Sequence, residues 1–231
     1  MSRVFVVGSG PSLAKTPIND MQGEDLFVMN KACKIWEALK FTVKPKYYFK
    51  MDYNYYDRHE WKEHVYWALE NCEKLYLWEQ FRTGYKVGHP NHDTMPDGLG
   101  NLEGYNVEWL NKCKEHSPYQ AGNWKATNTW HLPKLCTAFG SMNPILQLCS
   151  MMYDEIYLIG CDLGYTKDKE ANHAMTGYDT DLRDKSEQDL RNMTHIHKVA
   201  KRSSSVPIYN ATIGGNLEVY ERVDLLDVLN G

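Results

Sequence analysis

The stretch VFVVGSGPSL is the first place in the chain where residue types and spacing suit chemistry. A run of β-branched and aromatic residues ends there and is followed at once by Gly8, Ser9, Gly10, Pro11 and Ser12. Two glycines permit a tight turn whose amides can face an anion, and a helix starting near Ser12 would add its dipole. The third glycine of a dinucleotide fingerprint and the Gly-Lys-Ser/Thr of a P-loop are missing, so a purely structural turn is the alternative.

Two further polar residues follow apolar runs that read as the second and third strands. Asn30 ends LFVMN, and Asp52 ends YYFKMD. Because the carboxyl ends of parallel strands meet at one edge of a sheet, both are expected near the glycine turn, where they could bond a base or ribose hydroxyls. Each could instead be an ordinary helix N-cap.

A second candidate anion site precedes an apolar helix expected from residue 141. Thr137, Gly140 and Ser141 supply a hydroxyl, a glycine and a second hydroxyl just before that helix. Small residues at a helix start leave backbone amides accessible to a phosphate.

The segment YLIGCDLGY, followed by NHAMTG, supplies candidate catalytic side chains. The strand expected there stops at Gly160, and Asp162 and Tyr165 then project into the same crevice. His173 follows in a polar loop, where a histidine can act as a base, as an acid or as a hydrogen-bond donor to a phosphate.

The elements that must position these residues alternate along the chain. Short apolar runs predict strands at residues 4–7, 26–29, 47–51, 74–78, 155–159 and 206–209. Helical patterns lie between them at residues 31–39, 56–70, 141–152 and 187–201. This alternation predicts an α/β, Rossmann-like fold with a mainly parallel sheet of about six strands and helices on both faces.

Residues 81–130 interrupt this alternation, because they are rich in Gly, Asn, His, Pro and Trp and show no sustained period. A segment of this kind before the fifth strand predicts a long irregular insertion or lid. The 231 residues, 42% of them hydrophobic, suit one domain spanning residues 1–231.

Charge and composition exclude several function classes. The formal net charge of -4 gives no polybasic face, so nucleic acid is not an expected partner. Six widely spaced cysteines predict reduced thiols, and no apolar run approaches the roughly 18 residues of a membrane span. We therefore expect a cytoplasmic protein without a transmembrane segment, and a homo-oligomer is compatible with the sequence.

Two patterns invite a metal hypothesis. Asp179 and Asp181 form the Asp-x-Asp that many glycosyltransferases use to hold Mn²⁺, but aspartates in a charged loop are commonly only solvated. Histidine pairs occur without a cysteine or carboxylate at a zinc-binding spacing. We expect no metal site.

Three blocks, taken in order, resemble the motility accessory factor glycosyltransferases, which modify flagellin with nonulosonic acids. They are VVGSGPSL, YLIGCDLGY with NHAMTG, and IYNATIGGNLEVYERV. The first two also resemble the bacterial sialyltransferases, and the archaeal 6-hydroxymethylpterin diphosphokinases are a third related group. The resemblance covers the two ends of the chain, about half of it, and leaves out residues 55–130.

The resemblance implies a sialyltransferase-like enzyme that needs no metal or other cofactor. It assigns residues 8–12 to the donor phosphate, Asn30 and Asp52 to the nucleotide, and Gly160 with Asp162 to the close of the fifth strand. The donor would be a nucleotide-activated sugar, a CMP-linked nonulosonic or sialic acid. The acceptor would be a hydroxyl of a glycan or protein, and its attack would invert the anomeric carbon of the sugar.

The resemblance leaves the catalytic base unresolved. His173 matches the histidine of the accessory factor motif and is our preferred base, with Tyr165 stabilising the leaving phosphate. The sialyltransferases have their catalytic histidine later, near His195 and His197. Those two lie two residues apart on an expected helix, so at most one can face inward.

Two other functions are consistent with the sequence. A pterin-type diphosphokinase would use ATP and Mg²⁺, with Asp52, Asp162 and Asp179 converging as metal ligands. A non-catalytic nucleotide-binding protein would keep the fold without turnover.

Overall fold

The computed structural model describes residues 1–51, 61–84, 98–111, 135, 140–165, 172–178 and 187–231, without the side chain of Gln188. Its strands are β1 (Arg3–Val7), β2 (Asp25–Met29), β3 (Tyr47–Lys50), β4 (Lys74–Trp78), β5 (Val107–Leu110), β6 (Glu155–Ile159), β7 (Ile208–Asn210) and β8 (Glu221–Arg222). Its α-helices are α1 (Ala32–Ala38), α2 (Trp61–Asn71), α3 (Glu79–Thr83), α4 (Met142–Met152), α5 (Glu187–Ser203) and α6 (Leu225–Asn230). Two 3-10 helices, η1 (Pro11–Lys15) and η2 (Ile18–Asp20), follow β1.

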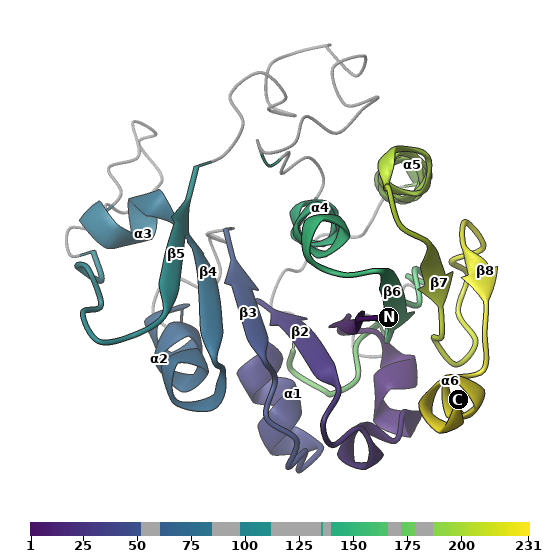
Figure 1. The fold of residues 1–231 in the computed structure, drawn as a ribbon, viewed down its shortest axis with the longest axis horizontal. Helices are drawn as coiled ribbons and strands as arrows, with labels where there is room; N and C mark the ends of the chain where they lie inside the picture. Colours follow the sequence, from purple (N-terminus) through teal and green to yellow (C-terminus); the bar gives the residue numbers. More distant parts are fainter. Residues whose placement is uncertain (52–60, 85–97, 112–134, 136–139, 166–171, 179–186) are drawn as a thin grey trace.

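The strands of the described chain form one parallel sheet in the order β5-β4-β3-β2-β1-β6-β7-β8 (Figure 1). The chain builds the sheet outward from β1 to β5 and then returns to place β6 on the other side of β1. Strands β1 and β6 pair from Arg3 opposite Glu155 to Val7 opposite Ile159. The space beyond their carboxyl ends is therefore the topological switch point, where open α/β sheets bind ligands.

Side chains that alternate along the strands fill two core clusters, one on each face of the sheet. Phe5 and Val7 belong to the cluster that includes side chains of α1, α2 and α6, whereas Val4 and Val6 belong to the cluster with α4 and α5. Figure 1 shows these two groups of helices on opposite sides of the sheet. Burial on both faces explains why β1 is a continuous apolar run rather than an alternating one.

The prediction of about six strands is wrong, because the described sheet has eight. The additional strands are β5, inside the segment expected to be irregular, and β8. The side chains of β5 are only partly buried or exposed, and both residues of β8 are exposed. Neither strand is therefore a buried apolar run, which was the pattern that identified the others. The α/β class and the parallel sheet are confirmed.

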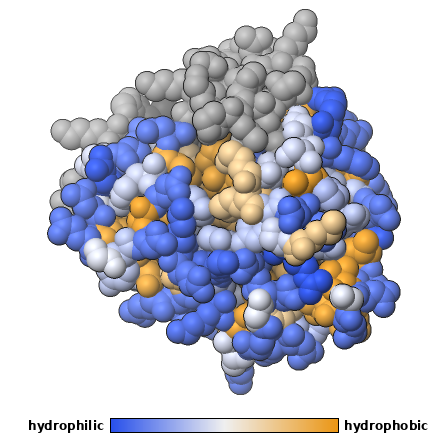
Figure 2. Space-filling view, viewed as in Figure 1, coloured by the Kyte–Doolittle hydropathy of each residue, from blue (hydrophilic) through white to orange (hydrophobic). Residues whose placement is uncertain are grey.

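The surface seen in Figure 2 is mainly hydrophilic, with hydrophobic residues in small separate groups. None of the helices in the described ranges has both the length and the apolar character needed to cross a bilayer. Residues 85–97 and 112–130, most of the expected insertion, lie outside the described residues. The prediction of a lid there, and of one domain over the whole chain, stays a prediction.

Candidate functional site at the β1–β6 switch point

The glycine turn after β1 lies directly against the end of β6. The Gly8 amide donates to the Ile159 carbonyl oxygen at 2.8 Å, and the Gly10 amide donates to the Gly160 carbonyl oxygen at 2.8 Å. A Cβ atom on Gly8 would lie 2.3 Å from that Gly160 oxygen. The two strand ends therefore meet so closely that a side chain at Gly8 has no room.

Asp162 ties the same turn to β6 from the other direction. Its carboxylate accepts the Ser12 hydroxyl at 2.7 Å and, more weakly, the Ser12 amide at 3.3 Å. A Cβ atom on Gly10 would lie 2.0 Å from Oδ2 of this carboxylate, which is 8% exposed. Asp162 therefore holds the turn in place through an almost fully buried contact.

These contacts change what the turn can do for an anion. The amides of Gly8, Gly10 and Ser12 all donate within the protein, so they do not form the open cradle that the sequence suggested. The helix that begins at Pro11 is a five-residue 3-10 helix, too short to add a substantial dipole. The role of residues 8–12 in nucleotide binding stays a prediction.

Asn30 and Ser141 meet across the sheet edge. The Asn30 side-chain amide donates to Ser141 Oγ at 3.1 Å, and the Tyr48 hydroxyl donates to the Asn30 carbonyl oxygen at 2.6 Å. Asn30 has φ of 53°, a left-handed conformation that asparagine tolerates better than most residues. The residue that follows β2 is thereby joined to β3 and to the residue before α4.

A cavity of about 210 Å³ occupies the switch point. It is lined by residues 8–10, 140–142 and 160–165, together with Met29, Asn172, Met193 and His197. Among these residues, all of which the structure describes, Asp162 carries the one formal charge and no lysine or arginine occurs. Met29, Met142 and Met193 give the cavity an adaptable apolar wall.

His173 packs against the glycine turn and is not among the residues that line the cavity. Its Nδ1 lies 3.1 Å from Ser9 Oγ, and the next amide, Ala174, donates to the Ser9 carbonyl oxygen at 2.9 Å. Its ring lies 4.5 Å from the Tyr178 ring and 6.5 Å from the Tyr165 ring, centroid to centroid. Tyr165 itself lines the cavity, so His173 stands one side chain behind the surface that a ligand would touch.

His197 reaches the cavity from α5. It is one turn beyond Met193, and both line the cavity, whereas His195 does not. Its Nδ1 lies 3.0 Å from the Tyr220 hydroxyl oxygen, and burial lowers the pKa of the imidazole to about 4. A neutral imidazole at pH 7 can accept a proton.

No family model matches the chain, and no curated protein matches it. A solved structure, the MAf glycosyltransferase from Magnetospirillum magneticum AMB-1, superposes with a TM-score of 0.54 over 96% of this chain, at 16% sequence identity. The two proteins share a fold.

The chain spans 33% of the length of that glycosyltransferase. The shared fold agrees with the resemblance to the motility accessory factor glycosyltransferases, and an identity of 16% shows the fold alone. Membership of the family and the link to the diphosphokinases stay predictions.

Several predicted positions cannot be placed. Asp52 and Thr137 lie outside the described residues, as do Asp179 and Asp181 of the Asp-x-Asp pattern. Within the described ranges, no group of three or more His, Cys, Asp or Glu side chains is placed to hold a metal ion.

Burial of His197 predicts that acid destabilises the fold. The imidazole pKa is lowered to about 4 from 6.5, so between these values the unfolded chain binds a proton that the folded chain does not. Stability is therefore lost as the pH falls through 6.5 towards 4, by about 2 kcal/mol between pH 7 and pH 5 for this one group.

Urea unfolding at pH 7 and pH 5 measures this loss. The His197→Gln variant should lose about 2 kcal/mol less than the native chain over the same interval, because glutamine does not titrate. His195→Gln, on the same helix and partly exposed, is the control. Equal losses in the native chain and His197→Gln would show that His197 is not kept neutral by burial.

Proposed function

We propose that the chain is a glycosyltransferase that takes its sugar from a CMP-linked nonulosonic or sialic acid. The observation that carries this proposal is the cavity at the β1–β6 switch point, which has a neutral histidine in its wall and lies in a fold shared with a MAf glycosyltransferase. The acceptor is a hydroxyl of a glycan or protein.

The charge of the cavity favours a donor with a single phosphate. The described lining has one carboxylate and no cationic side chain, so a diphosphate with its higher charge would be poorly neutralised. The phosphodiester of a CMP-linked nonulosonic or sialic acid carries one negative charge, and the second charge of the donor lies apart, on the sugar carboxylate. A diphosphate instead holds two charges on adjacent phosphates. The hydroxyls of Ser9, Ser141 and Tyr165 all lie in the lining, and a hydroxyl can rotate to donate to the phosphodiester oxygens. Ser141 then gives up Asn30 Oδ1, and Ser9 gives up His173 Nδ1.

The reaction needs a base and a route for the leaving group. A histidine nitrogen takes the proton of the acceptor hydroxyl while the hydroxyl oxygen attacks the anomeric carbon from the face opposite the phosphate. The new carbon–oxygen bond forms as the bond to the phosphate oxygen breaks, and the electron pair leaves with CMP. Tyr165 stabilises the charge that develops on the phosphate.

Geometry favours His197 over His173 as this base. His197 lines the cavity, whereas His173 is held behind it by Ser9 and Tyr178. The sequence match of His173 to the accessory factor motif keeps it as the competing candidate.

Thermal unfolding with nucleotides tests the proposal. CMP should raise the melting temperature without metal, and more than CDP, UDP, GDP or ATP, because a ligand bound by the native state stabilises it. A response to ATP that requires Mg²⁺ would replace the proposal with the diphosphokinase. Stabilisation by CMP without turnover of any CMP-linked donor would indicate the non-catalytic nucleotide-binding protein.

A pair of variants on α4 shows whether the CMP effect comes from this cavity. Met142→Glu places a second carboxylate in the lining and should remove most of the CMP shift by repelling the phosphate. Met151→Glu adds the same charge at an exposed position near the far end of the helix and should leave the shift intact. Equal shifts in both variants would place the CMP elsewhere.

A further inference from the structure

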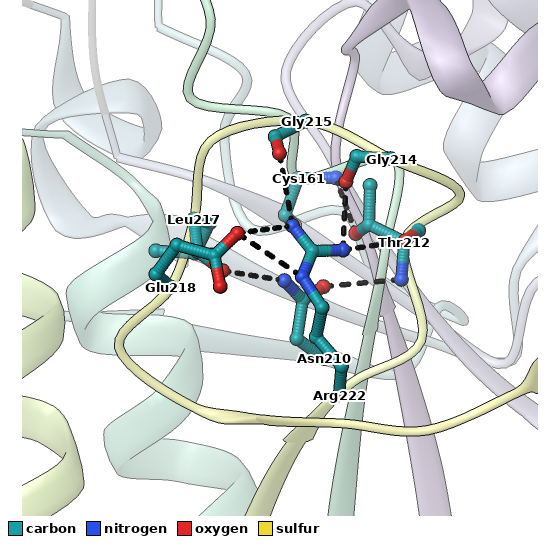
Figure 3. Close-up of polar contacts among 8 residues, drawn as sticks. All are labelled: Cys161, Asn210, Thr212, Gly214, Gly215, Leu217, Glu218 and Arg222. Carbon is teal, nitrogen blue, oxygen red and sulfur yellow. Dashed lines mark hydrogen bonds and ion pairs between the residues drawn. The ribbon is translucent and has the colours of Figure 1, made fainter.

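The block IYNATIGGNLEVYERV forms a loop that is closed on itself by an arginine. We call residues 210–222 the Arg222 loop. Figure 3 shows the Arg222 guanidinium at its centre, surrounded by backbone carbonyl groups of the loop. Arg222 Nη1 donates to the carbonyl oxygens of Thr212 at 3.2 Å and Gly214 at 2.8 Å, and Nη2 donates to that of Gly215 at 2.9 Å. The Glu218 carboxylate accepts from Nε and Nη2 and completes the set.

Side chains at the start of the loop attach it to the sheet. The Asn210 side chain donates to the Leu217 carbonyl oxygen at 2.7 Å and accepts the Thr212 amide at 3.0 Å. Thr212 Oγ1 in turn accepts the Cys161 amide at 3.1 Å, just beyond β6 (Figure 3). The loop therefore supplies the hydrogen-bond acceptor for the first backbone amide after Gly160, that of Cys161.

The second glycine of the loop, Gly215, and the residue after it lie against the backbone of Asp162. The Asn216 amide donates to the Asp162 carbonyl oxygen at 2.6 Å. Gly215 has φ of 77°, and a Cβ atom there would lie 2.7 Å from Asp162 Cα. Only glycine combines this conformation with so close an approach, so Gly215 supports the residue whose carboxylate holds Ser12.

The far end of the loop reaches the other wall of the cavity. Tyr220 is buried, and its hydroxyl lies 3.0 Å from His197 Nδ1 and 3.2 Å from the His197 carbonyl oxygen. The two rings meet edge to face, 5.5 Å apart. One loop thus contacts both Asp162 and His197.

We propose that the Arg222 loop positions the two polar walls of the cavity, and that Tyr220 sets the tautomer of His197. A hydroxyl has one proton. When Tyr220 donates it to the carbonyl oxygen of His197, its oxygen accepts the Nδ1 proton of the ring. The lone pair then stands on Nε2, the nitrogen that Tyr220 does not contact. Tyr220 and Arg222 are positioning residues in this arrangement, acting through His197 and Asp162.

Nitrogen-15 NMR of the histidines in the unliganded protein tests the role of Tyr220. His197, assigned by the loss of its signals in His197→Gln, should show a protonated Nδ1 and an unprotonated Nε2. Tyr220→Phe should shift this pattern towards the Nε2-protonated form. Tyr209→Phe, which removes a partly exposed hydroxyl from the neighbouring strand β7, should leave it unchanged. A protonated Nε2 in the native chain, or an unchanged tautomer in Tyr220→Phe, would overturn the inference.

Hydrogen exchange tests the role of Arg222. In Arg222→Gln the amides of Cys161 and Asn216 should exchange at least about tenfold faster, because the loop that protects them is opened. Arg222→Lys should lie between, since an ammonium cannot span three carbonyl groups in the manner of a guanidinium. Arg191→Gln, which removes an exposed pair with Glu187, is the control. Unchanged exchange in Arg222→Gln would contradict the proposed support of Asp162.

The consequence for catalysis rests on the proposed function. If CMP-linked donors are substrates, Tyr220→Phe should lower kcat at least about tenfold with little change in KM. His197 would then carry its proton on the wrong ring nitrogen, while the cavity keeps its shape. The NMR and exchange measurements need no substrate. If the donor assignment is wrong, the NMR and exchange results should still be as expected. If the Arg222 loop does not position His197 and Asp162, those two measurements will show it without any substrate.

Discussion

Replacing His197 with glutamine should reduce sugar transfer by about 10²-fold, the lower end of the contribution of a general base, because a pKa lowered to about 4 makes the imidazole a weaker base. Glutamine is close to histidine in size and keeps an amide for Tyr220, but it cannot take up the proton of an acceptor hydroxyl. Affinity for CMP should change little, since the cavity keeps its walls. Release of CMP from a CMP-linked sialic acid, with and without acceptor, measures the rate, and the thermal shift with CMP measures binding.

Two companion variants make the result specific. His195→Gln lies on the same helix away from the cavity lining and should keep nearly full transfer. His173→Ala distinguishes the two candidate bases. If transfer survives in His197→Gln and disappears in His173→Ala while CMP still binds, the base is His173, as the accessory factor motif suggests.

The choice between the candidate histidines shows how much of the site can be predicted from the sequence. Spacing alone showed that His195 and His197 could not both face inward. Along α5, Met193, Ile196, His197 and Ala200 lie at helical spacing, and Ile196, His197 and Ala200 are buried. This stripe was visible in the sequence and could have selected His197. The contact between His197 and Tyr220 was not visible, because it joins α5 to a loop that is separate from it in the sequence.

The glycine turn shows a different limit. The apolar run of β1 predicted a buried strand, and the glycines that follow predicted a tight turn. Both are found. The partners of the Gly8 and Gly10 amides are the carbonyl oxygens of Ile159, which ends β6, and of Gly160, which follows it, about 150 residues later in the chain. Which groups a turn's amides face is decided by strand order, and strand order depends on contacts that a local pattern does not encode.

Strands β5 and β8 are the part of the sheet that the sequence pattern did not predict. Their side chains are half-buried or exposed, so backbone pairing with a neighbour defines them more than burial does. The six strands that the sequence predicted are those with buried apolar side chains. An apolar pattern finds the strands that build the core and passes over those at the sheet edges.

Replacing Gly8 with alanine should destabilise the fold by about 3 kcal/mol, at the upper end of the usual cost of overpacking. The added Cβ would lie 2.3 Å from the carbonyl oxygen and 2.8 Å from the carbonyl carbon of Gly160. These are backbone atoms, so relief requires β1 and β6 to separate. Separation would also lengthen the hydrogen bond from the Gly8 amide to Ile159. Urea unfolding measures the loss.

Gly164→Ala is the matched control for this prediction. Gly164 lies in the same site, and the nearest atom to a Cβ there is the side-chain nitrogen of Asn216, at 3.3 Å. The end of a side chain can move, so the cost should stay within about 1 kcal/mol. Similar losses in both variants would mean that β1 and β6 can part at little cost. Since the cavity lies at their carboxyl ends, a large loss in Gly8→Ala alone means that the strand contact that stabilises the sheet also fixes the shape of the site.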